Sequence, residues 1–434
     1  MRYLITLILL LGFSKSVGAQ VIINTLHEAF ELASQQNLTL KEAALKTAIA
    51  GKQQEISRSS LLPGITALGS WQQNFSLPVN VITLNNNGEQ QRIETRFGTS
   101  YTMSGAIDIT LPLINTSAWK QQQISNYQEE LSGLQQAAQA QQLKQEIARV
   151  YYTCLLHTTQ QQMLRKNDRK NDTLLANAQR KKENGIIDPL EFNRIRTLKL
   201  SSANQLQQVS LARETALSRL KILLGIAPTA TLRLTQDLTQ TATITQPYEV
   251  SGSRLPAYQA SVVETRISES RVNEKELSRL PVLNAFARFS RQALGDDFNF
   301  YTDRNGWFAN SYAGLQMSLP LFNGLGTHAS VQQARQNAQL ARIRQQRTLL
   351  EANQQIREIQ LNRKKALRGT DNTRNIFTIS EENYRIASYK YEQGLFSADQ
   401  LISLYSEQVE ARNAYLEQLS SLLSAEAALF ILAN

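Results

Sequence analysis

The stretch GTSYTMSGAIDITLPLIN, residues 98–115, decides the fold of this 434-residue chain. Its last five residues, LPLIN, return in the second half of the chain as LPLFN at 319–323, and a long Gln- and Ala-rich stretch follows each copy. LPGI at 62–65 and LPVL at 280–283 form a second matched pair. Solenoid repeats have periods of about 20–50 residues, and this period is far longer. We therefore interpret the chain as one structural half written twice.

Each half has the same order of expected elements: helix, strand, loop, strand, very long helix, turn and return helix. We divide the chain into a signal peptide at 1–19, a first repeat at 20–225, an equatorial linker at 226–253 and a second repeat at 254–434. The expected strands lie at about 64–82, 98–113, 282–295 and 307–321, and the tip turns between the long and return helices lie at 184–189 and 393–398.

The expected strands alternate apolar and polar residues. From Tyr101 to Leu113 the odd positions are mainly apolar, and the even positions are mainly Ser, Thr and Asp. Such a strand has one apolar and one polar face, which could cover a soluble core or contact lipid. A tilted transmembrane strand needs ~9–11 residues, and the joining segments 84–97 and 295–306 are polar, so we favour lipid. If such strands enclose a pore, we expect Gln, Asn, Ser and Thr to line it, with weak ion selectivity.

The long helices predict an elongated molecule. Residues 117–183 and 327–392 contain no proline, and at ~1.5 Å per residue each spans ~100 Å. The return helix carries a narrow apolar stripe from Leu401 to Phe430 among polar residues. Narrow stripes on long polar helices are typical of coiled-coil pairs. Prolines mark the strand–helix junctions, since proline lacks an N–H and disfavours a helical residue before it: Pro63, Pro112, Pro281 and Pro320.

Four strands cannot form a closed barrel alone, because about eight are needed to enclose a filled interior. An open sheet in lipid would leave unsatisfied backbone groups, each costing several kcal/mol. We therefore expect the chain to form an oligomer. Symmetry permits a dimer, a trimer or a tetramer, and these strands do not choose among them.

Composition supports an exported protein whose strands enter a membrane. Arg2, the apolar residues 4–13 and the small residues 17–19 form a secretory signal pattern. After it, no apolar run reaches the ~20 residues of a spanning helix, and mean hydropathy is −0.33. Cys154 is the only cysteine, which excludes an intrachain disulfide. We expect it to be a small buried apolar residue.

Patterns of catalysis, metal binding and nucleic-acid binding are missing from the sequence. The net charge is +10, but no basic stripe with interleaved aromatic residues indicates nucleic acid. His27, His157 and His328 lie far apart without partners at metal-ligand spacing. Residues 324–329 fit a G-x-G-x-x-A dinucleotide pattern, but the next helix runs on for ~100 Å, and residues 115–118 of the first half lack both glycines. We expect no enzyme activity, cofactor or metal.

The doubled order of elements, the LPL-x-N strand ends and the two glycine turns resemble the TolC family of outer-membrane efflux proteins over essentially the whole mature chain. The resemblance implies a mainly α TolC-like homotrimer with four β-strands per protomer in a 12-stranded barrel in outer-membrane lipid. A long α-helical coiled-coil barrel would extend into the periplasm. The implied partners are a periplasmic adaptor (membrane fusion) protein and an inner-membrane pump of the RND, ABC or MFS type.

The resemblance also assigns two groups of site residues. The adaptor-docking tips would be Gly185, Ile186, Ile187, Asp188, Gly394, Leu395, Phe396 and Ser397. The periplasmic gate would include Tyr391, Asp399, Gln400 and Glu191. The family's charged lock is not reproduced, because Phe396 occupies its basic position and Gln400 its acidic one. We therefore expect a gate that is closed partly by hydrogen bonds. Both tip glycines are also suited to end a helix.

The function that these observations favour is a passive exit duct of a tripartite efflux or type I secretion system. A stand-alone porin is one alternative, but a porin needs only barrel and loops and would not use the long helices. A non-pore coiled-coil envelope protein is another, and it would leave the alternating strands unexplained. The sequence leaves open whether the cargo is a drug, metal, dye or protein, and which pump and adaptor are served.

Overall fold

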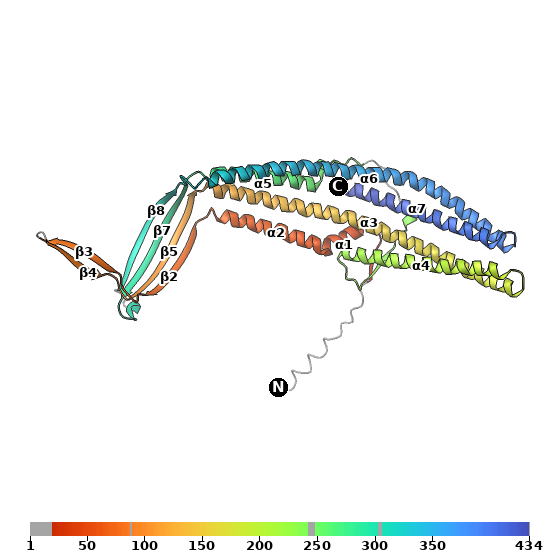
Figure 1. Ribbon diagram of the computed structural model, residues 1–434, viewed down its shortest axis with the longest axis horizontal. Helices are drawn as coiled ribbons and strands as arrows, with labels where there is room; N and C mark the ends of the chain where they lie inside the picture. The colour runs from red at the N-terminus through yellow and green to blue at the C-terminus, as the bar shows by residue number, and fades with distance from the viewer. Residues whose placement is uncertain (1–19, 87–88, 242–247, 303–305, 434) are drawn as a thin grey trace, which may run out of the picture. The chain divides into compact units, whose positions relative to one another are not determined.

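The computed structural model describes residues 20–86, 89–241, 248–302 and 306–433, so the signal peptide expected at 1–19 lies outside the described residues (Figure 1). Helices dominate the fold. The two longest are α3 (Thr116–Glu183) and α6 (Gly326–Glu392), and α4 (Pro189–Leu224) and α7 (Ala398–Ala433) return from them. The shorter helices are α1 (Leu26–Gln36), α2 (Leu38–Ser59) and α5 (Pro256–Leu277). The predicted mainly α fold with a small β part is confirmed.

The chain divides into two compact units, and each draws on both halves of the sequence. One comprises the described parts of 1–46, 132–260 and 345–434, and the other comprises 47–131 and 261–344. The units cut across the sequence repeats because α3 and α6 each contribute to both. The division into two repeats and a linker therefore stays a prediction about the sequence.

The second unit contains a four-stranded antiparallel sheet in the order β2-β5-β7-β8. The strands are β2 (Gly64–Gln73), β5 (Tyr101–Ile114), β7 (Val282–Gly295) and β8 (Trp307–Ser318). β7 has the predicted bounds. β8 ends three residues before the predicted 321, ahead of Pro320, which has no N–H to donate to a ladder.

The prediction of one strand over residues 64–82 is wrong, because β2 ends at Gln73. Residues 79–86 instead form β3 (Val79–Asn86), which pairs with β4 (Glu89–Arg96) in a separate antiparallel hairpin. Pro78 stands between β2 and β3 and cannot donate to a strand ladder. The expected loop at 84–97 is therefore largely strand, and Figure 1 shows the hairpin beyond the end of the sheet.

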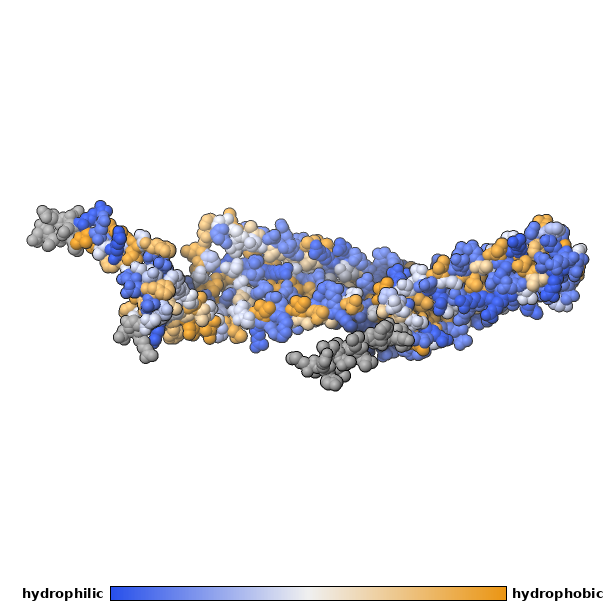
Figure 2. Space-filling model, turned by 90° about the horizontal axis from the view of Figure 1, so that it is seen from below, coloured by the Kyte–Doolittle hydropathy of each residue, from blue (hydrophilic) through white to orange (hydrophobic). Residues whose placement is uncertain are grey.

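The register gives the sheet two faces of different polarity. Ser70 lies opposite Ser104, their hydroxyl oxygens are 2.7 Å apart, and Asp108 lies opposite Arg288 with a 2.7 Å contact between Oδ1 and Nε. The opposite face carries mainly apolar side chains, and Figure 2 shows hydrophobic residues over the sheet. This face includes Ile65, Trp71, Met103, Ile107, Ile109, Phe289, Leu315 and Met317. The predicted alternation is therefore present in the fold.

The first unit begins with a parallel strand pair that the sequence analysis missed. β1 (Gln20–Ile23) pairs with β6 (Thr231–Leu234) inside the segment predicted as a linker. Each strand has four residues, which is too short for an alternating pattern to stand out. Among its described residues, the linker also contains the 3-10 turn η1 (Leu238–Gln240), and a second turn, η2 (Gly252–Arg254), begins at its end.

The main hydrophobic core of the first unit lies beside this strand pair. Ile23 of β1 packs with side chains of α3, α4 and α7, including Tyr151, Leu220 and Leu416, all at most 1% exposed. Cys154 belongs to the same core, as expected, and burial raises the pKa of its thiol to about 12. These residues hold the long helices together midway along α3.

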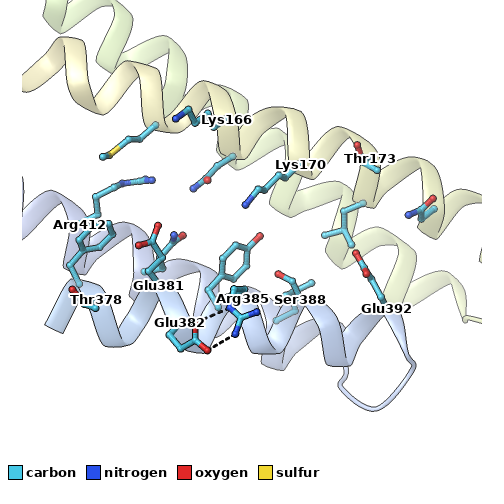
Figure 3. A pocket seen from close by; sticks show the side chains of 18 residues that line it. Lys166, Lys170, Thr173, Thr378, Glu381, Glu382, Arg385, Ser388, Glu392 and Arg412 are labelled. Carbon is cyan, nitrogen blue, oxygen red and sulfur yellow. Dashed lines mark hydrogen bonds and ion pairs between the residues drawn. The ribbon is translucent and has the colours of Figure 1, made fainter. Parts of the chain in front are cut away.

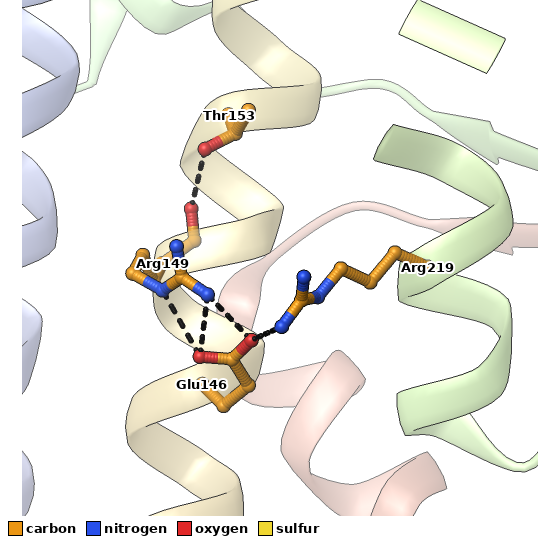
Figure 4. A network of polar contacts seen from close by, with 4 residues as sticks. All are labelled: Glu146, Arg149, Thr153 and Arg219. Carbon is orange, nitrogen blue, oxygen red and sulfur yellow. Dashed lines mark hydrogen bonds and ion pairs between the residues drawn. The ribbon is translucent and has the colours of Figure 1, made fainter. Parts of the chain in front are cut away.

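An ion-pair network joins α3 to α4 at the same level (Figure 4). The carboxylate of Glu146 accepts hydrogen bonds from Arg149 and from Arg219, each 2.6 Å from Nη2 to Oε1. The hydrogen bond from Arg149 is the main reason that the pKa of Glu146 lies below its ordinary value, although partial burial opposes the shift. The network therefore favours the charged carboxylate and fixes the pairing of the two helices.

Helix α7 is long and apolar enough to cross a membrane by length and composition. However, 56% of its most apolar window is buried inside the protein. The helix also carries the buried Glu426, which Arg363 of α6 contacts at 3.4 Å. We therefore interpret α7 as a core helix. A largely buried surface and a buried charge with an ion-pair partner fit packing inside the protein, whereas a charged side chain in lipid is costly.

Candidate functional site at the helix tips

Two tight turns connect the long helices to their return helices. Gly185 and Gly394 have φ values of 71° and 75°, in the left-handed region that favours glycine. Ile186 N donates to the carbonyl of Lys181 over 2.8 Å, and Leu395 N donates to that of Lys390 over 2.9 Å. These bonds satisfy carbonyls that a helix end leaves free. The two halves of the chain thus form the same turn.

Side chains also cap both return helices. Asp188 Oδ1 accepts from Glu191 N over 2.7 Å, and Pro189 follows at the first position of α4. Ser397 N donates to Oε1 of Gln400 over 2.9 Å, while Gln400 N donates to the Ser397 hydroxyl over 3.4 Å. This reciprocal arrangement is a capping box. Gln400 thus caps its own helix in this conformation, although it was predicted as a gate residue.

The apolar residues predicted to dock a partner fall into two groups. Ile186 is 67% exposed and Leu395 is 72% exposed. Ile187 and Phe396 are partly buried and pack on the hydrophobic cluster beneath the turns. The ammonium of Lys390 lies 4.9 Å from the centre of the Phe396 ring. Only Ile186 and Leu395 therefore present large apolar side chains to solvent at the turns.

Beneath the turns, all four long helices meet in one apolar cluster. It contains residues of α3, α4, α6 and α7: Ala178, Phe192, Ile195, Leu198, Tyr384, Ala387, Tyr391, Ala398, Leu401, Tyr405 and Val409. Tyr391 is 4% exposed, and its hydroxyl has no hydrogen-bond partner among the described residues. Burial raises its pKa to about 12, and the nearby charge of Glu191 adds to the shift. The predicted gate residues Tyr391 and Glu191 are thus neighbours.

An ion pair between Arg194 and Asp399 joins the second turn of α4 to the first turn of α7. The sequence analysis named Asp399 but missed Arg194. A usable signal was present, since Arg194 follows its tip glycine by nine residues and Asp399 follows its own by five. This pair crosses between the α3–α4 and α6–α7 hairpins.

Two cavities lie between the hairpins of the first unit. One, of about 470 Å³, lies between α4 and α7 and is lined by Leu190, Arg194 and Ile402, among others. The other, of about 920 Å³, lies between α3 and α6 (Figure 3). Lys166 and Lys170 line its α3 side, and acidic residues of α6 line the other. Polar cavities between paired helices indicate an interface that is only partly closed by packing.

Arg412 is the most buried charged side chain at the larger cavity. It is 3% exposed, its Nε and Nη2 have no hydrogen-bond partner among the described residues, and burial lowers its pKa. Glu381 of α6 is the carboxylate that opposes this effect.

Across the described residues, no group of three or more His, Cys, Asp or Glu is placed to hold a metal ion.

The match to a family model decides the identity. Residues 29–226 and 253–434 match the model described as outer membrane efflux protein. The chain belongs to the outer membrane efflux protein family. This efflux protein is therefore an exit duct of the outer membrane and not an enzyme. Members of the family form trimers and work with an adaptor and an inner-membrane pump in tripartite systems.

Solved structures share the fold of the efflux protein at low sequence identity. The Campylobacter jejuni CmeC outer membrane channel is 18% identical, with a TM-score of 0.76 over 94% of this chain and 85% of that one. VceC of Vibrio cholerae is 15% identical, with a TM-score of 0.75 over 94% and 96%. The open state of the Neisseria gonorrhoeae MtrE channel is 15% identical, with a TM-score of 0.76 over 94% and 88%. No curated protein sequence matches the chain.

Proposed function

We propose that three copies of the efflux protein form one duct, in which the helix tips act both as a periplasmic gate and as the docking site for an adaptor. The observation that carries the proposal is the four-helix contact at the tips, where Arg194 pairs with Asp399 and Tyr391 is buried. Four strands from each copy would complete the barrel, because open sheet edges are unfavourable in lipid.

The gate would be closed by contacts between the α3–α4 and α6–α7 hairpins. Tyr391 and the ion pair Arg194–Asp399 both bridge these hairpins. Lys181 of α3 supports the contact, with its ammonium 5.4 Å from the centre of the Tyr391 ring. Opening would separate these groups, and each would regain water. The energy difference between closed and open states would therefore be small.

The adaptor would dock on the exposed apolar residues of the turns. Ile186 and Leu395 expose most of their side chains to solvent at the two tips, and exposed apolar residues of this kind are typical of interaction surfaces. The groove between α4 and α7 begins beside the turns at Leu190. A hydrophobic helix tip of a periplasmic adaptor would complement these residues, and an inner-membrane pump of the RND, ABC or MFS type would supply the energy.

Residues 1–19 would direct export as a signal peptide and would be removed. The pattern of one arginine, an apolar segment and small residues supports this assignment. Docking of the adaptor at the mature protein can be tested with a single introduced thiol, because Cys154 is the only native cysteine and is buried.

The experiment places a photoactivatable thiol crosslinker on Leu395→Cys in cells that express the full efflux system. Leu361→Cys, at a residue of α6 that is 57% exposed, is the matched control, and maleimide labelling reports that both thiols are reachable. We expect Leu395→Cys to crosslink a periplasmic adaptor and Leu361→Cys not to. Equal crosslinking of the adaptor by both labelled variants, or by neither, would contradict docking at the tips.

A further inference from the structure

The apolar face of the sheet carries one cationic side chain, that of Arg291. In the register, Arg291 of β7 lies opposite Gly105 of β5 and Ala309 of β8, and Gly69 of β2 continues the same row. Directly paired residues of antiparallel strands point to the same face. Phe289 shares that face and is 54% exposed. Arg291 thus stands where the surrounding pattern would place an apolar residue.

The two arginines of β7 have opposite surroundings. Arg288 points to the polar face, where Asp108 is its ion-pair partner at 2.7 Å. Arg291 makes no side-chain hydrogen bond or ion pair among the residues that the structure describes. Its face carries no Asp or Glu on any of the four strands. A neighbouring copy that joined at β2 or β8 could therefore bring no carboxylate to this face.

The row of Arg291 also leaves open space at its two glycines. A Cβ atom added at Gly69 or at Gly105 would meet nothing within 4 Å. Glycine inside a strand is unfavourable, since it loses more conformational freedom on folding and packs no side chain. Gly105 beside Arg291 and Gly69 on the next strand thus form a shallow notch, which a ligand can enter from the lipid side.

The position of Arg291 along the strand corresponds to a lipid headgroup. Two residues further on, the row of Ala293 contains Trp71 and Trp307, and an aromatic cluster continues from Trp71 through Tyr101. Such aromatic side chains mark the membrane–water interface of barrels. At ~3.4 Å per residue the offset is ~7 Å along the strand, a distance that an arginine side chain can span by snorkelling.

We propose that Arg291 binds the phosphate of an anionic glycolipid of the lipid A type in the outer leaflet of the outer membrane. The proposal rests on the barrel of the proposed duct. Loop residues 296–302 lie at the end of the sheet away from α3. Because the helices of the proposed duct extend into the periplasm, this end of the sheet faces outward, and the row of Arg291 lies in the outer half of the membrane. A guanidinium presents a fork of N–H donors that fits phosphate oxygens, and the low dielectric of the interface strengthens the contact.

The test measures lipid binding to the detergent-purified oligomer by native mass spectrometry with diphosphorylated lipid A as the added lipid. Arg291→Gln removes the cation, and Arg288→Gln on the other face of the same strand is the matched control. Hydrogen bonds to charged groups predict about tenfold or greater loss of lipid A affinity for Arg291→Gln. Arg288→Gln and the wild type should bind alike, and dephosphorylated lipid A should bind weakly to the wild type and to both variants.

Unchanged lipid A binding by Arg291→Gln would overturn the site, as would equal losses in both variants or equal binding of dephosphorylated lipid A by the wild type. Arg291→Lys should retain part of the affinity, because it keeps the charge without the fork. The number of chains per particle appears in the same spectra. A wild-type monomer would overturn the duct itself, whereas an intact oligomer without lipid selectivity would overturn this site alone.

Discussion

Replacing Arg194 by alanine is expected to open the helix tips of the efflux protein more often. The side chain pairs with Asp399 across the two helical hairpins, and this contact exists only while the hairpins are together. Truncation removes the ion pair from the closed state and removes nothing from the open state. The closed-to-open ratio should therefore fall.

The size of the effect follows from the exposure of the pair. Arg194 and Asp399 are 41% and 58% exposed, so solvent screens the attraction, and exposed pairs contribute about 0.2–1 kcal/mol. Three copies that open together would lose about 0.6–3 kcal/mol if their contributions add. This corresponds to a roughly 3-fold to 150-fold lower closed-to-open ratio. The effect should shrink in 1 M salt, where the screening length is about 3 Å.

The assay is single-channel recording of the purified protein in planar lipid bilayers. Arg194→Ala and Asp399→Ala should both raise the open fraction, and the charge-reversed double variant R194D/D399R should restore closure. Arg385→Ala is the matched control, since Arg385 pairs with Glu382 within α6 alone and joins no two helices. The reasoning is refuted if Arg194→Ala and Asp399→Ala both record like the wild type, or if Arg385→Ala raises the open fraction as much as they do.

Three further predictions concern the first unit. Gly225→Ala should lower Tm strongly, because φ is 74° and the added Cβ would lie 2.6 Å from the backbone of Gln36; Gly185→Ala, with a similar φ but open space, should lose only ~1–2 kcal/mol, and thermal circular dichroism compares the two. The Cys154 thiol, with its pKa raised to about 12 by burial, should resist maleimide at pH 8 until the protein is denatured, as mass spectrometry can show. The pKa of Glu146 is lowered in the folded protein, so its charged carboxylate stabilises the fold at pH values above the ordinary carboxyl pKa. This stabilisation is lost as pH falls through the pKa of the folded state, and Tm should therefore fall less on acidification in Glu146→Gln than in wild type.

The sequence predicted those parts of the fold that repeat over many residues. The alternation from Tyr101 to Leu113 and the proline-free stretches of α3 and α6 each extend over several turns or pleats, so local pattern and final structure agree. The glycine turns were predictable for the same reason, because Gly185 and Gly394 occupy equivalent places in two copies of one half. Both turns need a left-handed backbone at this position, which explains why glycine occurs in both copies.

The missed parts depend on contacts between distant segments. β1 and β6 are four residues each, and their pairing links positions about 210 residues apart. The first residues of β3 were merged with β2 because the alternating pattern continues past Pro78, although proline ends the ladder. The rest of the β3–β4 hairpin was predicted as a loop. Arg194 looked like an ordinary surface charge, and only the packing of α4 against α7 brings it to Asp399.

The central claim is that the four-stranded sheet of each copy is completed by strands of its neighbours, and hydrogen–deuterium exchange tests it most directly. β2 and β8 are the edges of the sheet, while β5 and β7 are paired on both sides within one chain. In a closed barrel, amide protons of the edge strands should exchange as slowly as those of β5 and β7 in the detergent-solubilised oligomer. Fast exchange of every second amide along β2 and β8, with β5 and β7 protected, would contradict the account.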